Sequence, residues 1–150
     1  MTPIALGEPD LRLGGLRLWV RGRQFPDARD YWDGNWLEIV AVCSYPGARI
    51  ELTGPYLRTD ELQGFMDACA RLHRELTGEA VLETLEPNLK VVMSGNGRGR
   101  IHLAVSLTPG HVTQQHSFED DIDQTEVLAV VSSLRAVLEN FPTIGPPDQP

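Results

Sequence analysis

Two stretches of this chain carry apolar residues at helical spacing, and alternating, strand-like segments precede each of them. The first stretch follows Thr59, a helix N-cap candidate, with Asp60 and Glu61 suited to the positive end of a helix dipole. The second follows Asp123, and Glu126 three residues later completes a capping-box pattern. The two apolar stripes are Leu62, Phe65, Met66, Cys69, Leu72 and Leu76, then Val127, Val130, Val131, Leu134, Val137 and Leu138. The chain is therefore expected to fold as strands, a helix, further strands and a second helix, in that order.

Alternation and turn residues locate the strands. Gly14-Gly15 separates the alternating segments 10–13 and 16–21, which predicts a hairpin with a two-residue turn. The run 36–45 is apolar on both faces, which is typical of a central strand, and residues 48–52 return after a turn. Further strands are expected at 80–85, 89–94, 101–107 and 112–118.

These elements predict an α+β fold. We expect one mostly antiparallel β-sheet with two α-helices packed on one face, the first helix ending at Gly78. A chain of 150 residues is the size of one domain, so residues 1–142 are assigned to a single α+β domain. Residues 143–150 are rich in proline and are expected to form a flexible tail.

The charge of −8 is unevenly distributed. Residues 1–58 hold seven arginines and seven acids, whereas the remainder carries 14 acids against five arginines and Lys90. This balance argues against nucleic acid as a partner, because phosphate binding needs a basic field, and it favours a basic partner or simple solubility. No apolar run approaches the length of about 20 residues that a membrane span needs, and the start of the chain lacks the pattern of a secretory signal. We therefore expect a cytoplasmic protein.

The glycine-rich segment, the histidines and the cysteines show no spacing typical of a phosphate-binding or metal-binding site. The glycine-rich segment 95–99 lies between expected strands, whereas a phosphate cradle opens a helix, so we interpret it as a hairpin turn. His102 and His116 fall on adjacent strands, but no acid or cysteine stands at a fixed ligand spacing from either. Cys43 and Cys69 share no metal-binding spacing and are expected to be buried free thiols. We expect no cofactor.

The segment 119–123 packs four acids into five positions. It lacks the glycine of an EF-hand loop. We interpret it as a solvated loop that caps the following helix, with a binding site for a basic partner as the alternative.

Two of the three tryptophans, Trp32 and Trp36, lie within five positions of each other across the turn signal Asp33-Gly34. One interpretation is a loop anchored by aromatic side chains over the core. The other is a recognition surface, because exposed aromatic residues beside an aspartate are typical of binding hot spots.

The segment Trp32-Asp33-Gly34-Asn35-Trp36-Leu37 resembles the WapI-type immunity proteins of bacteria. Further landmarks of the resemblance follow the same order from about residue 11 to 142, namely Phe25-Pro26, Leu57–Leu62, Leu85–Leu89 and Phe141-Pro142. The resemblance implies a non-enzymatic protein that protects a bacterium from the toxic C-terminal domain of a contact-dependent toxin by stoichiometric binding. In the namesake system the toxin acts on tRNA. The family implies no catalytic residues.

The expected partner is thus a cognate toxin domain that is basic in character. One version of the hypothesis makes this domain a nuclease. The chain itself is expected to bind it as a monomer or a homodimer. An acidic inhibitor would be steered electrostatically towards such a partner. The residues chosen as anchors are Tyr31, Trp32 and Asp33, and those chosen as steering charges are Glu119, Asp120 and Asp121. The alternatives are a small cytosolic interaction or regulatory domain with another partner, and a small-ligand binder or enzyme, which would need an apolar pocket with convergent polar groups.

Overall fold

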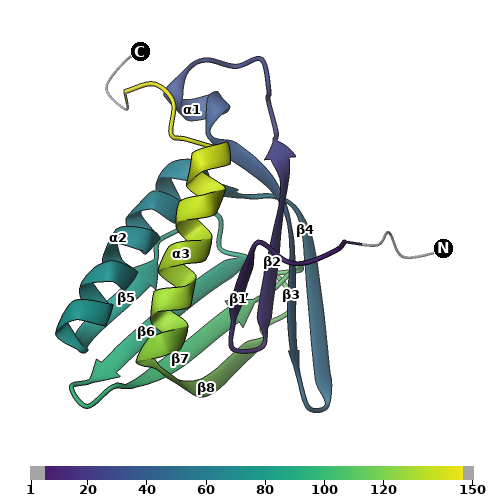
Figure 1. Ribbon diagram of the computed structural model, residues 1–150. Coiled ribbons are helices and arrows are strands. Elements are labelled where there is room, and N and C mark those ends of the chain that lie inside the picture. The colour runs from purple at the N-terminus through teal and green to yellow at the C-terminus, as the bar shows by residue number, and fades with distance from the viewer. Residues whose placement is uncertain (1–5, 147–150) are drawn as a thin grey trace.

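The structure, a computed structural model that describes residues 6–146, contains two four-stranded antiparallel sheets and three helices (Figure 1). The first sheet consists of β1 (Leu11–Leu13), β2 (Leu16–Arg23), β3 (Trp36–Tyr45) and β4 (Ala48–Arg58). The second consists of β5 (Thr77–Leu82), β6 (Leu89–Asn96), β7 (Arg100–Leu107) and β8 (Ser117–Asp123). The helices are α1 (Tyr31–Gly34), α2 (Thr59–Glu75) and α3 (Gln124–Asn140).

The chain builds the same unit twice, a four-stranded meander followed by a 17-residue helix. The expectation of a single sheet with two helices is therefore wrong. The order of elements along the sequence does not reveal that α2 ends one meander and that β5 begins another without pairing with β4. The third helix, α1, is a single turn within a segment that sequence patterns describe only as a polar loop.

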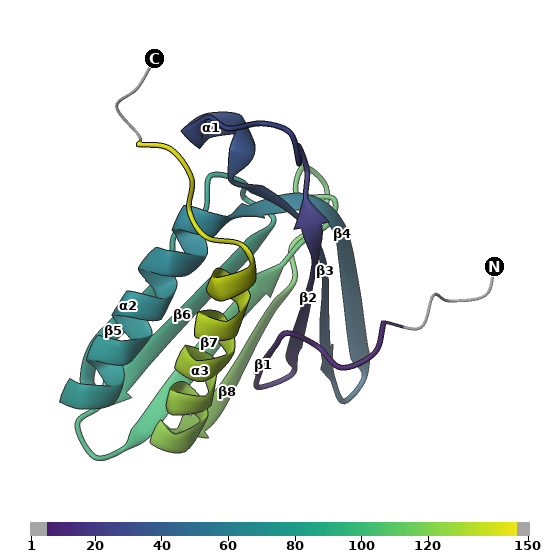
Figure 2. The same ribbon diagram turned by 45° about the horizontal axis from the view of Figure 1, so that its top comes forward.

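The two units share one hydrophobic core. Helices α2 and α3 pack against each other across one face of β5–β8, and β1 contacts α3 (Figures 1 and 2). Tyr45 joins the sheets, because its ring stacks on Phe118 with centroids 5.3 Å apart. Its hydroxyl accepts the Gly15 N–H at 2.9 Å and donates to Asp120 at 3.2 Å. Buried apolar residues from both sheets and from α2 and α3 form a single cluster.

The first hairpin and the central strand are confirmed. Leu13 pairs with Leu16 across a turn in which Gly14 has a positive φ of 55°, a conformation that glycine adopts without strain. Strand β3 lies between β2 and β4. Cys43 and Cys69 are buried free thiols, as expected, and burial raises their pKa values to about 11 and about 12.

The apolar stripes of both long helices are confirmed as core-facing except at Leu76, which lies just beyond α2 and outside the core cluster. The ends of α2 also differ from the prediction. Arg58, and not Thr59, occupies the N-cap position, and the helix stops before Gly78 because Leu76 adopts the left-handed conformation with φ 61°. The capping box of α3 is confirmed, since Asp123 and Glu126 bond each other's backbone N–H groups.

The acidic run at residues 119–123 departs furthest from its predicted local structure. Residues 119–123 form most of strand β8 rather than a solvated loop, and the strand expected at 112–118 is shifted accordingly. Ile122 pairs with Ile101 and is buried. Because strand side chains alternate between the two faces, the strand can bury Ile122 while the side chains of Asp121 and Asp123 on either side of it stay exposed.

Part of the expected tail lies against the body of the protein. The Ile144 backbone exchanges two hydrogen bonds with the Asn35 side chain, both 2.9 Å long. Residues 147–150 lie outside the described residues, so their predicted flexibility stays a prediction. Within residues 6–146, no helix combines the length and the apolar character that crossing a membrane requires.

Two glycines provide a matched test of this packing. A Cβ on Gly95 of β6 would lie 2.3 Å from the Leu76 carbonyl oxygen, whereas a Cβ on Gly64 of α2 would meet nothing within 4 Å. Gly95→Ala should therefore lower the free energy of unfolding by about 1–3 kcal/mol through overpacking. Gly64→Ala should raise it by about 0.5–1 kcal/mol, because alanine favours the helix. Urea unfolding curves measure both, and equal effects from the two variants would contradict the packing described.

Candidate interaction site

Helix α1 forms because its single turn is capped at both ends. The Asp30 side chain accepts the N–H of Asp33 at 3.0 Å, which is an N-cap bond. At the other end, the fully buried Asn35 donates to the Tyr31 carbonyl at 2.8 Å as well as pairing with Ile144. Gly34 allows close approach, since a Cβ there would lie 2.3 Å from the Ile144 side chain. The expected turn at 33–34 is thus the end of a short helix.

A buried arginine fastens this helix to the rest of the protein. The side chain of Arg58 is 1% exposed, and it lies at the junction of β4 and α2. Its guanidinium donates to the Trp32 carbonyl at 2.6 Å, to the Tyr31 carbonyl at 2.9 Å and to Asp60 at 3.0 Å. The two carbonyls belong to the last turn of α1, where the helix itself offers no partners. Arg58 therefore completes a helix that is too short to satisfy its own backbone.

Three aromatic rings surround the same guanidinium. The central carbon of Arg58 lies 5.0 Å from the ring centroid of Tyr31, 5.2 Å from that of Trp32 and 5.1 Å from that of Trp36. These distances are within the range of cation–π attraction. The clustering of these aromatic residues in the sequence is thus explained by an arginine more than twenty positions away, which sequence reasoning missed.

The first turn of α2 adds two carboxylates to the junction. Asp60 accepts the Tyr31 hydroxyl at 2.9 Å, and burial together with this bond raises the pKa of Tyr31. Glu61 accepts the Arg58 N–H at 2.8 Å with one oxygen and the Leu85 N–H at 2.6 Å with the other. Burial raises the pKa of Glu61, although both N–H bonds act in the opposite direction.

The three residues chosen as anchors are differently exposed. Trp32 is 52% exposed, Asp33 is exposed and Tyr31 is half-buried. Trp32 therefore combines the two interpretations drawn from the sequence, an anchor of the loop and an exposed recognition residue. Its ring contacts the buried Arg58, and about half of its surface is exposed.

The acidic run of β8 divides between the two faces of its sheet. Glu119 and Asp121 are exposed and flank His102 of β7, at 3.1 Å from its Nε2 and 3.3 Å from its Nδ1. Asp120 points to the opposite face, where it accepts the Tyr45 hydroxyl. The structure thus leaves two of the three expected steering charges together on the outer face.

The other candidate chemistry does not converge. His102 bonds the two carboxylates of β8, whereas His116 bonds Gln114, so the two histidines share no site. Among the described residues, no group of three or more histidine, cysteine, aspartate or glutamate side chains is arranged to hold a metal ion.

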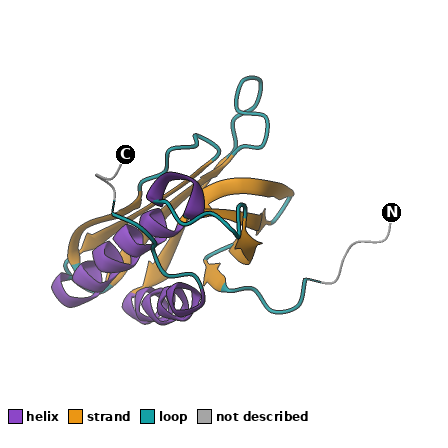
Figure 3. Ribbon diagram, turned by 90° about the horizontal axis from the view of Figure 1, so that it is seen from above, coloured by secondary structure: helices purple, strands orange, loops and turns teal. Residues whose placement is uncertain are grey.

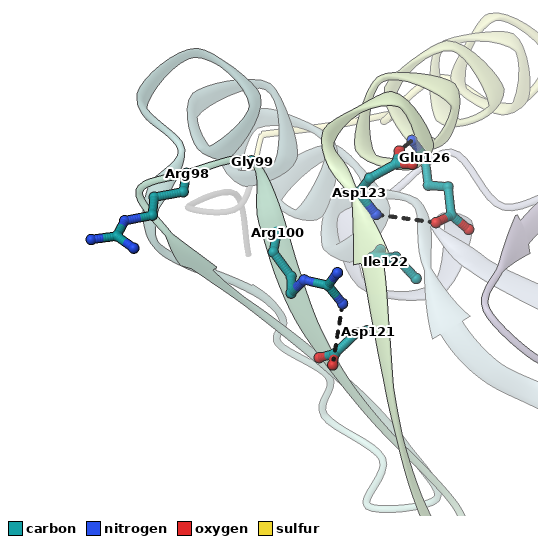
Figure 4. Close-up of a pocket in the computed structure, with 7 residues that line it drawn as sticks. All are labelled: Arg98, Gly99, Arg100, Asp121, Ile122, Asp123 and Glu126. Atoms are coloured by element: carbon teal, nitrogen blue, oxygen red, sulfur yellow. Dashed lines mark hydrogen bonds and ion pairs between the residues drawn. The ribbon is translucent and has the colours of Figure 1, made fainter.

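One open hollow of about 360 Å³ lies beside the turn between β6 and β7 (Figure 4). Its lining consists of Arg98, Gly99, Arg100, Asp121, Ile122, Asp123 and Glu126. Arg100 pairs with Asp121 at 3.6 Å, and Glu126 accepts the Asp123 N–H at 3.2 Å. Arg98 extends away from these groups (Figure 4). The other charged groups of the lining are engaged too, Arg100 and Asp121 with each other and the Asp123 and Glu126 carboxylates with the start of α3.

A family model described as "Immunity protein WapI-like family" matches residues 10–142. No curated protein matches the chain.

Two solved structures match the chain at low sequence identity. The Arabidopsis thaliana protein described as "WHY1" is 12% identical, with 87% of each chain covered and a TM-score of 0.50. A chain of the "CdiA-CT/CdiI toxin and immunity complex from Enterobacter cloacae" is 13% identical, with 67% of this chain and 89% of that chain covered and a TM-score of 0.43. The first of these likenesses supports the arrangement of strands and helices alone.

Replacing the buried guanidinium should weaken the whole junction. Arg58→Lys keeps the positive charge but loses the planar fork that reaches two carbonyls and Asp60 together. We expect the free energy of unfolding to fall by about 1.5–3 kcal/mol, the magnitude of a hydrogen bond to a charged group. Urea unfolding measures the loss, and the near-UV circular dichroism of the tryptophans should change with it.

Arg49→Lys is the matched control, because Arg49 forms an exposed ion pair with Glu51. Its effect should stay within about 0.5 kcal/mol. Equal stabilities of the two lysine variants would contradict the structural role of Arg58.

His102, which lies between two carboxylates, should lose its proton at a higher pH than an ordinary histidine does. The pKa of His102 is raised above its ordinary value of 6.5, first by the hydrogen bond to Glu119 and then by that to Asp121. The stabilisation it provides is therefore fully present below pH 6.5 and is lost as the pH rises through the raised pKa. An NMR titration of the ring measures this pKa. Glu119→Gln/Asp121→Asn should return it towards 6.5, and a wild-type value at or below 6.5 would refute the pairing.

Proposed function

The chain belongs to the WapI-like family of immunity proteins, and we propose that it binds and neutralises a cognate toxin domain in a stoichiometric, non-catalytic complex. The observation that carries the proposal is the family match over residues 10–142, which spans both meander-and-helix units. The protected compartment in this proposal is the cytoplasm of the cell that makes the protein.

The chemistry of the surface supports a basic partner. The chain carries a net charge of −8, and a single lysine occurs in its sequence. An acidic inhibitor attracts a basic domain over several ångströms of solvent and speeds its association, with rate constants up to about 10⁸–10⁹ M⁻¹s⁻¹ at low salt. A nuclease domain, which must itself attract nucleic acid, would have the required basic field.

Two surface regions are proposed to act on the partner, one as anchors and the other as steering charge. Tyr31, Trp32 and Asp33 supply aromatic and charged anchors, held in place by Arg58. Glu119 and Asp121 supply outward charge on β8. Asp120, also expected to steer the partner, is half-buried and engaged with Tyr45, so it is not counted among the outward steering charges.

Co-expression with the toxin domain encoded beside this chain in its own genome tests the function. The chain should restore growth, and the purified proteins should elute as a 1:1 complex. When the chain is added stepwise to the toxin domain, the toxin's activity should fall linearly to an end point near one equivalent, because each bound chain inhibits one toxin domain.

An immunity protein of unrelated sequence serves as the control and should give no rescue. Absence of rescue by a folded wild-type chain, or inhibition at far less than one equivalent, would contradict the proposal. The first result would favour an interaction domain with a different partner.

A further inference from the structure

Antiparallel topology brings three connections of this chain to one end of the molecule. They are the β2–β3 connection with α1, the β5–β6 connection and the β7–β8 connection, here called the loop end (residues 24–35, 83–88 and 108–116). Figure 1 shows α1 beside the start of α2 and the end of α3, and Figure 3 views the loops from above. Segments far apart in the sequence thus share one surface.

The exposed apolar side chains gather at this end. Five large hydrophobic residues are exposed among the described residues, and four of them lie on the loop end. They are Phe25, Trp32, Leu85 and Val112, exposed by 44%, 52%, 64% and 84%. The fifth, Leu128, lies on α3. Exposed apolar residues concentrated in one region mark an interaction surface more often than scattered ones do.

Two polar side chains, the half-buried Glu61 and the buried Asn88, tie the loops to one another. Glu61 accepts N–H groups from both Arg58 and Leu85, so it joins the anchor of α1 to the β5–β6 connection. The buried Asn88 then donates to the Thr108 carbonyl at 3.0 Å, while the Thr108 N–H returns a bond of 2.8 Å to the Asn88 carbonyl. This network links all three connections. A surface held in this way loses little conformational entropy when it binds.

The loop end is also acidic. Its carboxylates outnumber its one arginine, Arg29, and give a balance of −4, half of the net charge of the chain. The carboxylates are Asp27, Asp30, Asp33, Glu83 and Glu86. Apolar anchors rimmed by negative charge fit a protein surface with apolar recesses rimmed by lysine and arginine. The three connections hold 27 residues, which matches the roughly 20–30 that one partner contributes to a standard interface.

We infer that the loop end is the surface that contacts the toxin domain, with Trp32 and Leu85 as its anchors. The inference rests on the proposed function and deepens it. It adds Leu85 and Val112 to the aromatic residues of α1, and it assigns Glu119 and Asp121 of β8 to long-range attraction rather than to the contact itself.

Surface plasmon resonance with the purified, catalytically inactivated toxin domain tests this assignment. Trp32→Ala and Leu85→Ala should each weaken binding by about 10-fold or more, chiefly through faster dissociation, as truncation of a hot spot does. The Leu85 side chain is separate from its N–H bond to Glu61, so the substitution leaves the network intact. Glu119→Gln/Asp121→Asn should slow association at low salt and leave the dissociation rate unchanged.

Leu128→Ala is the matched control, because it removes an equally large exposed leucine outside the loop end. It should bind within 2-fold of the wild type. Wild-type affinity in both Trp32→Ala and Leu85→Ala would overturn the assignment while leaving the proposed function intact. Failure of the wild-type chain to bind would overturn the proposed function, and this inference with it.

Discussion

The buried guanidinium of Arg58 is the interaction on which the functional end of the protein depends. A one-turn helix cannot satisfy its own carbonyl groups, and a loop rich in aspartate and aromatic residues has little core of its own. Arg58 supplies donors to two of those carbonyls and a cationic centre for three aromatic rings. Because Asp60 balances the charge and also holds the Tyr31 hydroxyl, the arrangement is paired and hydrogen-bonded, as a buried charge must be.

The architecture gives this local junction its wider effect. Each meander reverses direction at every turn, so alternate connections return to the same end of the molecule. The first turn of α2 lies at that end, and its two carboxylates bond the elements on either side. Opposite it, the hairpin turns of β1–β2 and β3–β4 pack by Tyr45 against β8 and unite the two sheets. Rigid sheets therefore carry a surface built from connections, a common location for recognition.

Local patterns in the sequence predicted the local structure well. Glycine chemistry placed the first hairpin, apolar residues on both faces identified β3 as central, and periodicity identified the buried faces of α2 and α3. Long-range relations were not accessible in the same way. Nothing in the spacing shows that α2 separates two sheets, and the acids of β8 obscured a strand whose register is set by Ile122 pairing with β7. Arg58 was missed because its aromatic partners lie on two other elements, α1 and β3. The clustering of Tyr31, Trp32 and Trp36 within six positions was the one available signal.

Hydrogen–deuterium exchange of the chain, free and in complex with its cognate toxin domain, tests the central claim most directly. If the three tied connections form the binding surface, protection on binding should concentrate in residues 24–35, 83–88 and 108–116. The backbone amides of strands β6–β8 should exchange at nearly the same rate in both states. Protection confined to these strands, with the three connections exchanging as in the free chain, would contradict the claim.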